Sequence, residues 1–302
     1  MTTPRVLVIG DVATDVVVRP AGELADGSDT PAEIRITGGG AAANTAAWLA
    51  STGSPVTLVA RIGDDAAGRE RRAELAALGV SCAVAVDAGA PTGTIVVLVA
   101  RDGERTMLAD RGANLRLSPA DVSIGLDAAL AAEPAAKHLH LSGYALLDPA
   151  TRPAGRHALA AARAAGLTVS VDVASASPLA AADPVAFLRW VDGIDLLLAN
   201  GDEAAELTGV ADPAAAAEKL LATAATVVVK RGPHGAVWCA PGVRVAAAAE
   251  PVELVDSTGA GDAFAAGLLA AWLRGAEPAM ALRAGALLGA RAAGVVGARP
   301  IA

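Results

Sequence analysis

The sequence contains few of the residue types that mark disulfide-bonded, zinc-binding or nucleic-acid-binding proteins. Its 302 residues include two cysteines, Cys82 and Cys239, and four histidines. Two cysteines so far apart indicate neither a disulfide framework nor a zinc site. Aromatic residues make up 2% of the chain and the net charge is −8. Because nucleic-acid binding needs a concentrated basic face and aromatic stacking surfaces, we expect no nucleic-acid partner.

The sequence also lacks a long uninterrupted apolar stretch. Hydrophobic residues make up 54% of the chain, but no run of about 18 or more of them is free of charges, glycine or proline. The first apolar segment, residues 6–9, is too short for a signal peptide. We therefore expect a cytoplasmic protein with no membrane partner. Given the net charge, any anionic substrate must be held by a local cluster of amides, cations or a metal ion.

The alternation of strand and helix patterns predicts an α/β fold in which crossovers build a mostly parallel sheet. Strands are expected at 5–9, 14–19, 33–37, 56–61, 82–86, 92–100, 104–109, 137–141, 167–171, 194–199, 226–230, 235–239 and 243–247. Helices are expected at 41–51, 66–78, 150–165, 184–191, 202–208, 213–224, 261–274 and 278–295. No linker divides the chain, so residues 1–302 are interpreted as one domain. The hairpin-like strands near 12–37 and 90–110, the latter turning at Arg101-Asp102-Gly103, could pair as a separate small flap.

The stretch from Asp256 to Gly275 carries the clearest chemical signal. Gly259-Ala260-Gly261 is a small-residue turn in which backbone amides can converge, and an apolar helix follows it. Free amides at a helix N-terminus favour an anion such as phosphate. Asp262 is out of place beside an anion unless it has a task, such as taking a proton from an attacking hydroxyl. The alternative is that Asp262 only caps a buried helix.

Other polar groups follow predicted strands, and in open α/β sheets the carboxyl ends of the strands share one ligand-binding crevice. Asp11 and Asp15, the segment Gly38 to Asn44, and Asn200 with Glu203 could face this crevice together with Gly259 to Asp262. Lys230 to Gly235, which ends another strand, could line a nucleotide. Each has a plainer interpretation: a solvated turn, a flexible glycine turn, a helix cap with an acidic first turn, or a surface hairpin. The sequence contains neither the dinucleotide fingerprint nor the G-x-x-x-x-G-K-[ST] phosphate loop.

Taken together, in order and spacing, these segments resemble the ribokinase/PfkB family of ATP-dependent carbohydrate and nucleoside kinases. The resemblance covers essentially the whole chain. It rests on Asp-Ser-Thr-Gly-Ala-Gly-Asp-Ala-Phe at 256–264, on Gly-Gly-Ala-Ala-Ala-Asn at 39–44, and on Asn200 with Glu203 as the N-x-x-E motif. It implies a three-layer α/β/α ribokinase-like sandwich with a small β-sheet lid, and ATP-dependent phosphorylation of a sugar hydroxyl.

The resemblance also implies a role for each matching residue. Asp262 would be the general base, and the turn of Gly259, Ala260 and Gly261 would be the anion hole. Asn200 and Glu203 would orient the triphosphate and hold Mg²⁺ through water. The acceptor would be bound by Asp15, Gly39, Gly40 and Asn44, the nucleotide pocket would be shaped by Lys230, Gly232 and Gly235, and a monovalent cation such as K⁺ would be bound by Asp256, Thr258, Ala292 and Gly297.

Three positions depart from ribokinases themselves. Ala13 stands where ribokinases commonly have Asn, Ala41 where they have Lys, and Ile301 where they often have Ser. These departures weaken a strict ribokinase assignment and leave K⁺ activation open. Arg111, after the second flap segment, could bind a carboxylate or phosphate on the acceptor or lie in a solvated loop. Asp110 and Asn114 could reach the acceptor as well.

The expected partners are ATP and a small sugar or nucleoside. A nucleoside kinase of the adenosine kinase type is the alternative within the enzyme class, although aromatic side chains to stack a base are scarce. A non-catalytic sugar or nucleotide sensor of the same fold is the alternative outside it. Pairing of flap strands between two copies would give a homodimer through the lid.

Overall fold

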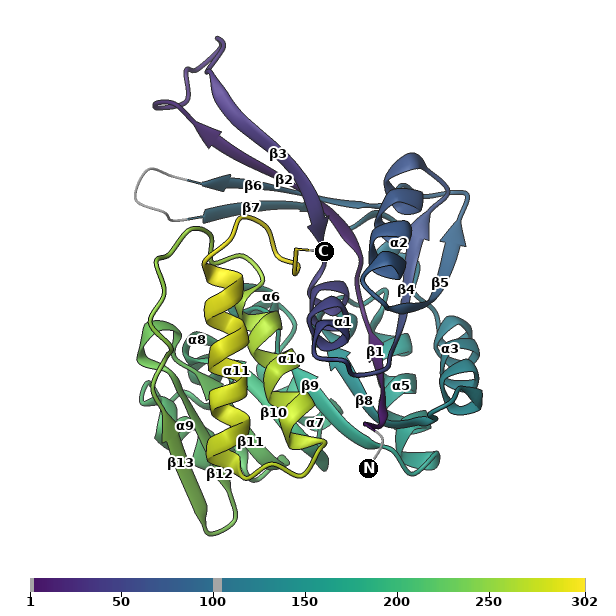
Figure 1. Ribbon diagram of the computed structural model, residues 1–302, viewed down its shortest axis with the longest axis vertical. Coiled ribbons are helices and arrows are strands. Elements are labelled where there is room, and N and C mark those ends of the chain that lie inside the picture. The colour runs from purple at the N-terminus through teal and green to yellow at the C-terminus, as the bar shows by residue number, and fades with distance from the viewer. Residues whose placement is uncertain (1–2, 100–104, 302) are drawn as a thin grey trace.

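The computed structural model describes residues 3–99 and 105–301. Over these residues the chain builds a nine-stranded sheet in the order β13-β12-β11-β10-β9-β8-β1-β4-β5 (Figure 1). The strands β11, β10, β9, β8, β1, β4 and β5, in their order across the sheet, run parallel. At one edge, β12 pairs antiparallel with β11, and β13 pairs antiparallel with β12. Their bounds are β1 Arg5–Ile9, β4 Val56–Gly63, β5 Ser81–Asp87, β8 Ala136–Ser142, β9 Thr168–Asp172, β10 Ile194–Asn200, β11 Ala224–Lys230, β12 Ala236–Ala240 and β13 Val243–Ala247.

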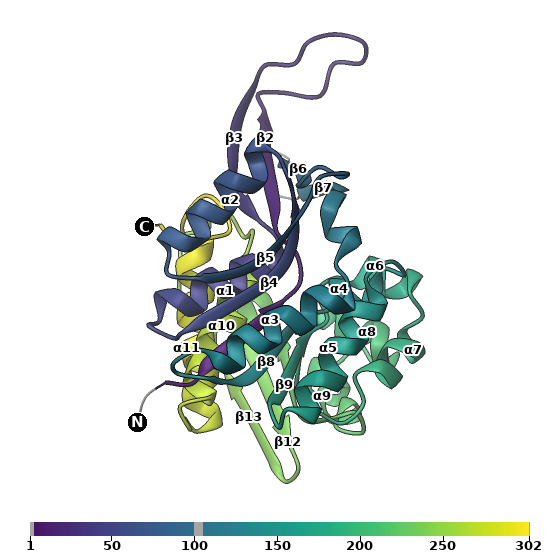
Figure 2. The ribbon, with the colours of Figure 1, turned by 90° about the vertical axis from the view of Figure 1, so that its right-hand side faces the viewer.

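Helices cover both faces of this sheet, as Figure 2 shows from the side. One face carries α1 (Ala41–Ser51), α2 (Ala66–Ala77), α10 (Ala260–Trp272) and α11 (Pro278–Ala293). The other carries α3 (Pro119–Ala131), α4 (Tyr144–Leu147), α5 (Arg152–Ala164), α6 (Ala176–Ala181), α7 (Pro184–Trp190), α8 (Gly201–Thr208) and α9 (Pro213–Leu220). The predicted three-layer α/β/α architecture is confirmed.

The apolar strands fit this arrangement because successive side chains point to opposite faces and both faces are covered. In β1, Leu7 and Ile9 belong to one hydrophobic core while Val6 and Val8 belong to the other. All four side chains are at most 1% exposed. A continuous apolar run is therefore what a central parallel strand requires.

A smaller sheet of four strands, within the same described residues, has the order β3-β2-β6-β7. Its strands are β2 (Ala13–Pro20), β3 (Ala32–Gly39), β6 (Gly93–Val99) and β7 (Arg105–Asp110). They come from the two segments in which hairpin-like strands were expected. The expected turn at Arg101-Asp102-Gly103 lies outside the described residues. In Figure 1, β1 runs upward from the N-terminus, and the small sheet lies above the carboxyl ends of the parallel strands.

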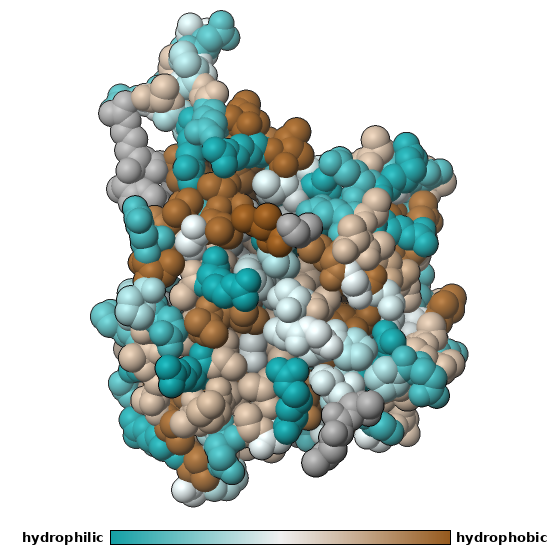
Figure 3. All heavy atoms as spheres, in the orientation of Figure 1, coloured by the Kyte–Doolittle hydropathy of each residue, from teal (hydrophilic) through white to brown (hydrophobic). Residues whose placement is uncertain are grey.

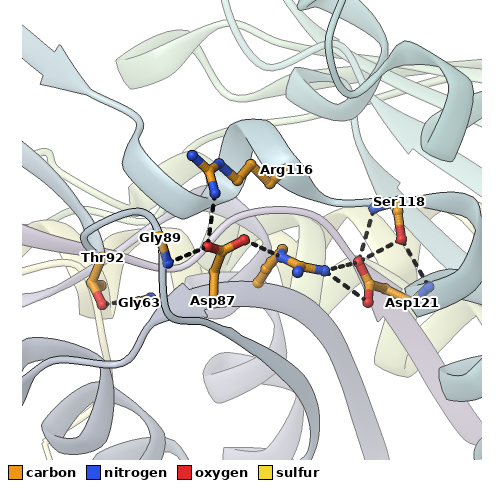
Figure 4. Close-up of polar contacts among 8 residues, drawn as sticks. Gly63, Asp87, Gly89, Thr92, Arg116, Ser118 and Asp121 are labelled. Carbon is orange, nitrogen blue, oxygen red and sulfur yellow. Dashed lines mark hydrogen bonds and ion pairs between the residues drawn. The ribbon is translucent and has the colours of Figure 1, made fainter.

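A polar network fixes the segments at the base of the small sheet (Figure 4). Asp87, at the end of β5, accepts hydrogen bonds from Arg61 Nε and Arg116 Nη1, both at 3.0 Å. Arg61 also binds Asp121 in the first turn of α3, with Nη1 2.8 Å from Oδ2. β4, β5, α3 and the 3₁₀ turn Gly112–Arg116 are thus linked where the chain enters β6 and leaves β7.

The two sheets differ in how much apolar surface they expose. Figure 3 shows apolar residues gathered on the upper part of the molecule, over the small sheet. Ile34 and Ile36 of β3 are 60% and 66% exposed, and Leu108 of β7 is 56% exposed. Ile36 pairs with Val16, Val16 pairs with Val96, and Val96 pairs with Leu108. These four residues therefore lie in one row across the four strands.

One predicted helix ends early, and the described helices α3, α4 and α6 were not predicted. The predicted helix at 213–224 ends at Leu220, because Ala224 already begins β11 and pairs with Ile194. Helix α3 was not predicted at all, although its start carries the signal of a capping box, with Ser118 and Asp121 satisfying each other's backbone amides. In the part of the chain that is described, no helix is long and apolar enough to cross a membrane.

Candidate active site

Two adjoining cavities lie at the carboxyl edge of the parallel strands among the described residues. The first, of about 670 Å³, extends beneath the small sheet. The second, of about 350 Å³, is lined by the last residues of four parallel strands, Ser142, Asp172, Asn200 and Lys230. Asp262 lines both cavities. Its carboxylate therefore stands where the contents of the two cavities would meet.

Asp262 is placed by the turn before α10. Gly259 has φ 73°, and a Cβ there would lie 2.6 Å from the carbonyl oxygen of Ala298, so the turn requires glycine. Gly259 lines the first cavity and Gly261 the second, while the amide of Ala260 donates to Ser257 O at 3.3 Å. Since no described side chain caps this helix, its first-turn amides can still bind an anion.

The carboxylate of Asp262 does not act as a helix cap. Its Oδ2 accepts a hydrogen bond from Asn44 Nδ2 at 2.9 Å. Burial raises the pKa of Asp262 from 3.8 to about 7; the Asn44 bond and Lys230 oppose the rise, and Asp172 adds to it. A carboxyl group that titrates near neutral pH is suited to exchange protons with a substrate hydroxyl.

The first cavity contains a second buried carboxylate, Asp15. Its Oδ1 has no hydrogen-bond partner among the described residues, and burial raises its pKa from 3.8 to about 6. Gly39 does not line the cavity; it makes room for Asp15, because a Cβ on Gly39 would lie 2.0 Å from Asp15 Oδ1. Gly40 lines the cavity, and its absent Cβ lets the chain approach the carbonyl of Asp11. A buried acceptor of this kind is suited to bind a hydroxyl group.

The first cavity also contains Arg111, which forms no ion pair with the described residues. The guanidinium of Arg111 lies 4.4 Å from the centre of the Tyr144 ring, and its Nε is buried without a hydrogen-bond partner among the described residues. Arg152 lines the same cavity, but its Nε and Nη2 donate to backbone carbonyls. Asn114, expected to reach the acceptor, instead holds both backbone groups of Val12 at 3.0 and 2.8 Å. Arg111 is thus the cation best placed to meet a ligand.

In the second cavity, Asn200 and Glu203 form a capping box at the start of α8. Glu203 N donates to Asn200 Oδ1 at 2.8 Å, and Asn200 N donates to Glu203 Oε2 at 2.7 Å. The capping interpretation is therefore confirmed, although both side chains still line the cavity. Burial raises the pKa of Glu203 from 4.5 to about 7, which Lys230 opposes and Asp172 reinforces.

Asp172 is a charged cavity residue that the sequence analysis missed. Its Oδ2 lies 2.5 Å from Lys230 Nζ, and both residues of this ion pair line the second cavity. Lys230 also approaches the turn of Gly259 to Gly261, since a Cβ on Gly261 would lie 3.5 Å from Nζ. Asp172 directly follows the predicted apolar strand at 167–171, much as Asp11 follows the first strand, and that position was the available signal.

The two glycines near Lys230 differ in place. Gly232 lines the second cavity. Gly235 forms the turn into β12 with φ 81°, and the carbonyl oxygen of Ala247 lies 1.9 Å from the position of a Cβ. Gly235 therefore supports the wall behind the cavity and does not line it.

The residues expected to hold a monovalent cation lie beside the turn. Asp256 Oδ1 accepts from Thr258 N at 2.9 Å and from Thr258 Oγ1 at 2.6 Å, and Asp256 Oδ2 accepts from Gly297 N at 3.1 Å. The carbonyl of Ala292 accepts from Val295 N at 3.3 Å. Within the described residues, no group of three or more His, Cys, Asp or Glu side chains is arranged to hold a metal by itself.

The sequence and the fold are both similar to those of known proteins. The profile of the pfkB family of carbohydrate kinases matches residues 3–302. The chain is 33% identical to the ATP-dependent ribose-1-phosphate kinase of Halopiger xanaduensis, over 98% of this chain and 94% of that protein. It is 33% identical to the 2-dehydro-3-deoxygluconokinase of Thermoproteus tenax, over 85% and 80%. The solved structure of adenosine kinase from Sinorhizobium meliloti superposes with a TM-score of 0.89 at 27% identity, over 100% and 97% of the two chains.

Proposed function

The chain belongs to the pfkB family of carbohydrate kinases, and we propose that it transfers the γ-phosphate of ATP to a hydroxyl group of a sugar acceptor. The observation that carries this proposal is the position of Asp262 on the boundary of the two cavities. The acceptor would occupy the first cavity and the triphosphate the second. The reacting hydroxyl would then lie between the carboxylate and the phosphate.

Asp262 is the general base of the proposed reaction. The acceptor hydroxyl gives its proton to the carboxylate while its oxygen forms a bond to the γ-phosphorus, and the bond to the bridging oxygen of ADP breaks with its electron pair. Charge on the transferred group is stabilised by amides of the Gly259-Ala260-Gly261 turn and by Lys230. The pKa of Asp262, raised by burial to about 7, allows proton uptake near neutral pH.

The second cavity is the proposed nucleotide site. Asn200, Lys230 and Gly232 line it, and Gly235 supports its wall. Glu203 and Asp172 bring carboxylates to the same space, a donor set that fits Mg²⁺ held mainly by phosphate oxygens and water. Glu203, through water, is the proposed protein contact, and Mg²⁺ would supply neutralisation of the triphosphate charge.

A monovalent cation such as K⁺ beside the anion-binding turn is a further part of the proposal. Asp256, Thr258 and Gly297 meet there through hydrogen bonds, and Ala292 in α11 is the remaining candidate donor. A cation at this place would support the turn electrostatically. Comparing activity in K⁺ with activity in tetramethylammonium at equal ionic strength tests this part.

We propose that the small sheet acts as a lid. Ile95, Val97, Met107 and Ala109 of β6 and β7 line the first cavity from above, so the sheet can exclude water that would otherwise compete for the phosphate. Its opposite face exposes Ile34 and Ile36, which supports a homodimer through the lid.

The acceptor itself is best described as a sugar that carries a phosphate or carboxylate. Arg111 supports this description, because its guanidinium is stacked on Tyr144 and can bind an anion in the first cavity. Two relatives that are 33% identical are named for acceptors of this kind, ribose 1-phosphate and 2-dehydro-3-deoxygluconate. The apolar lid residues favour a nucleoside as the second candidate, as does the similarity to adenosine kinase.

The proposal is tested by ADP release with Mg²⁺-ATP and a panel of neutral sugars, sugar phosphates, sugar acids and nucleosides, with the product identified by ³¹P NMR. We expect turnover with an anionic sugar. Best turnover with a nucleoside would select the second candidate. Binding of ATP and a sugar without ADP release from any acceptor would identify a sensor and refute the enzymatic proposal.

A further inference from the structure

The C-terminal segment contacts the candidate active site although it lines neither of its cavities. Ala298 packs against Gly259 of the anion-binding turn, and its carbonyl accepts a hydrogen bond from Trp48 Nε1 at 2.9 Å. The next residue, Arg299, is 6% exposed. A buried arginine is costly unless its donors are used, so its contacts indicate what holds it there.

The described residues give Arg299 a partner for each of its nitrogens. Nη2 donates to the carbonyl of Gly39 at 2.7 Å, and Nη1 lies 3.0 Å from Glu74 Oε2 in α2. Nε donates to Asn44 Oδ1 at 3.4 Å. The planar guanidinium therefore joins α2, the end of β3 and α1 at one point. A lysine has no such fork and could not make all these contacts together.

The contact with Asn44 determines which way its amide points. The oxygen of that amide faces Arg299, and its nitrogen donates to Asp262 Oδ2 at 2.9 Å. In the reversed orientation, the amide NH₂ would face a guanidinium and the amide oxygen would face a carboxylate. Both of those contacts are repulsive. Arg299 thus selects the orientation in which Asn44 donates to Asp262.

We propose that Arg299 is a positioning residue for catalysis: it orients the amide of Asn44, which in turn holds and stabilises the ionised carboxylate of Asp262. This inference rests on the proposed role of Asp262 as the base. It assigns to the C-terminal segment a task in the reaction beyond closing the fold.

The charged surroundings of both residues enter the test. Arg299 is faced by Glu74 and Arg71 from α2, by Asp15 from β2 and by Cys82 from β5. Asp262 is faced by Asn44 from α1, Asp172 from β9, Lys230 from β11 and Asp11 after β1. The Asn44 bond lowers the pKa of Asp262, so its loss must raise that pKa further.

The test is the Arg299→Met variant. The pKa of Asp262 is expected to rise by about one pH unit, because a hydrogen bond to a charged group is weakened. The acid limb of the pH profile of kcat/KM should move to higher pH by the same amount. The loss of kcat/KM should be roughly fivefold at pH 7 and should shrink toward pH 9, because the carboxylate is ionised there in both proteins. Carbon-13 NMR of carboxyl-labelled aspartate, assigned with Asp262→Asn, follows the same ionisation without turnover.

Arg71→Met is the matched control. Arg71 is a buried arginine of the same cluster, 4% exposed, which pairs with Glu70 and Glu74. Its removal should lower the melting temperature and leave the ionisation of Asp262 unchanged. Arg299→Lys, which keeps the charge, serves if the methionine variant does not fold, and it should shift the profile in the same direction.

A double-mutant cycle shows whether Arg299 acts through Asn44. In an Asn44→Ala background, Arg299→Met should move the Asp262 ionisation no further. An unchanged Asp262 ionisation in both Arg299 variants would overturn the inference, as would equal shifts in Arg71→Met or a full additional shift in the Asn44→Ala background. Absence of turnover in the wild-type protein would instead refute the proposed function, and the NMR measurement would still decide whether Arg299 controls Asp262.

Discussion

Replacing Asp262 with asparagine should make the protein more stable and nearly inactive. The pKa of Asp262 rises on folding from 3.8 to about 7, which corresponds to roughly 4 kcal/mol against the charged form. Asp262 as a whole residue is half-buried on the cavity walls, so we take about half of this value, ~2 kcal/mol, after solvent screening. Asparagine keeps the shape and can still accept from Asn44. Turnover should fall by about 10²- to 10⁴-fold, the usual contribution of a general base.

The pH dependence identifies the cause of the extra stability. Because the folded-state pKa is raised, the folded protein binds the proton more tightly, and stability falls as pH rises from about 4 to about 7. The Asp262→Asn variant lacks this titrating group, so its stability should not show this fall with rising pH. Its melting temperature should exceed that of the wild type by about 4 °C at pH 8, and the difference should shrink steadily toward pH 4.

Differential scanning calorimetry of the ligand-free proteins at several pH values measures this difference, and isothermal titration of ATP shows that binding is retained. Asp127→Asn on the exposed side of α3 is the control, with no change expected. A stability difference that is the same at pH 5 and pH 8 would contradict the electrostatic reasoning. Turnover close to that of the wild type would contradict the assignment of the base.

Three further predictions concern the metal, the acceptor and the lid. Glu203→Gln should raise the Mg²⁺ concentration needed for half-maximal activity by about tenfold, and an unchanged titration would exclude Glu203 from the metal's surroundings. Arg111→Met should lower kcat/KM for an anionic sugar by about 10- to 100-fold and leave a neutral sugar unaffected; equal losses for both would rule out anion binding. Ile36→Lys should shift a dimer toward monomer in light scattering, whereas Ile124→Lys, at an equally exposed position on α3, should not.

The candidate site was predictable where its residues are neighbours in the chain. The turn at Gly259 to Gly261 and the proposed base, Asp262, need only a local helix start, which the sequence displays directly. Asn200 and Glu203 are likewise local. They form the capping box at the start of α8, so the motif that predicted a helix cap is the same motif that predicted a site. The polar ends of parallel strands could be grouped because topology alone brings them together.

The rest of the site depends on contacts across the chain that no local pattern reveals. Arg299 and Asn44 are separated by 255 positions, and Lys230 and Asp172 by 58. No local sequence pattern around Arg299 indicates that its side chain contacts Asn44 in α1. Helix α3 was missed for a different reason, since Ile124, 67% exposed, interrupts the apolar periodicity that a surface helix normally shows.

The carboxylates of Asp15, Glu203 and Asp262 share one physical cause for their raised pKa values. Burial raises the pKa of each, and the cations beside them, Arg299 and Lys230, reverse only part of that rise. A fold selected only for stability would neutralise these groups or replace them. In a chain with a net charge of −8, such carboxylates on cavity walls support the proposed partners: hydroxyl groups for Asp15 and Asp262, and the metal-bound triphosphate for Glu203. Binding of these proposed partners would offset the cost of burying the carboxylates, which would link binding to the assembly of the reacting centre.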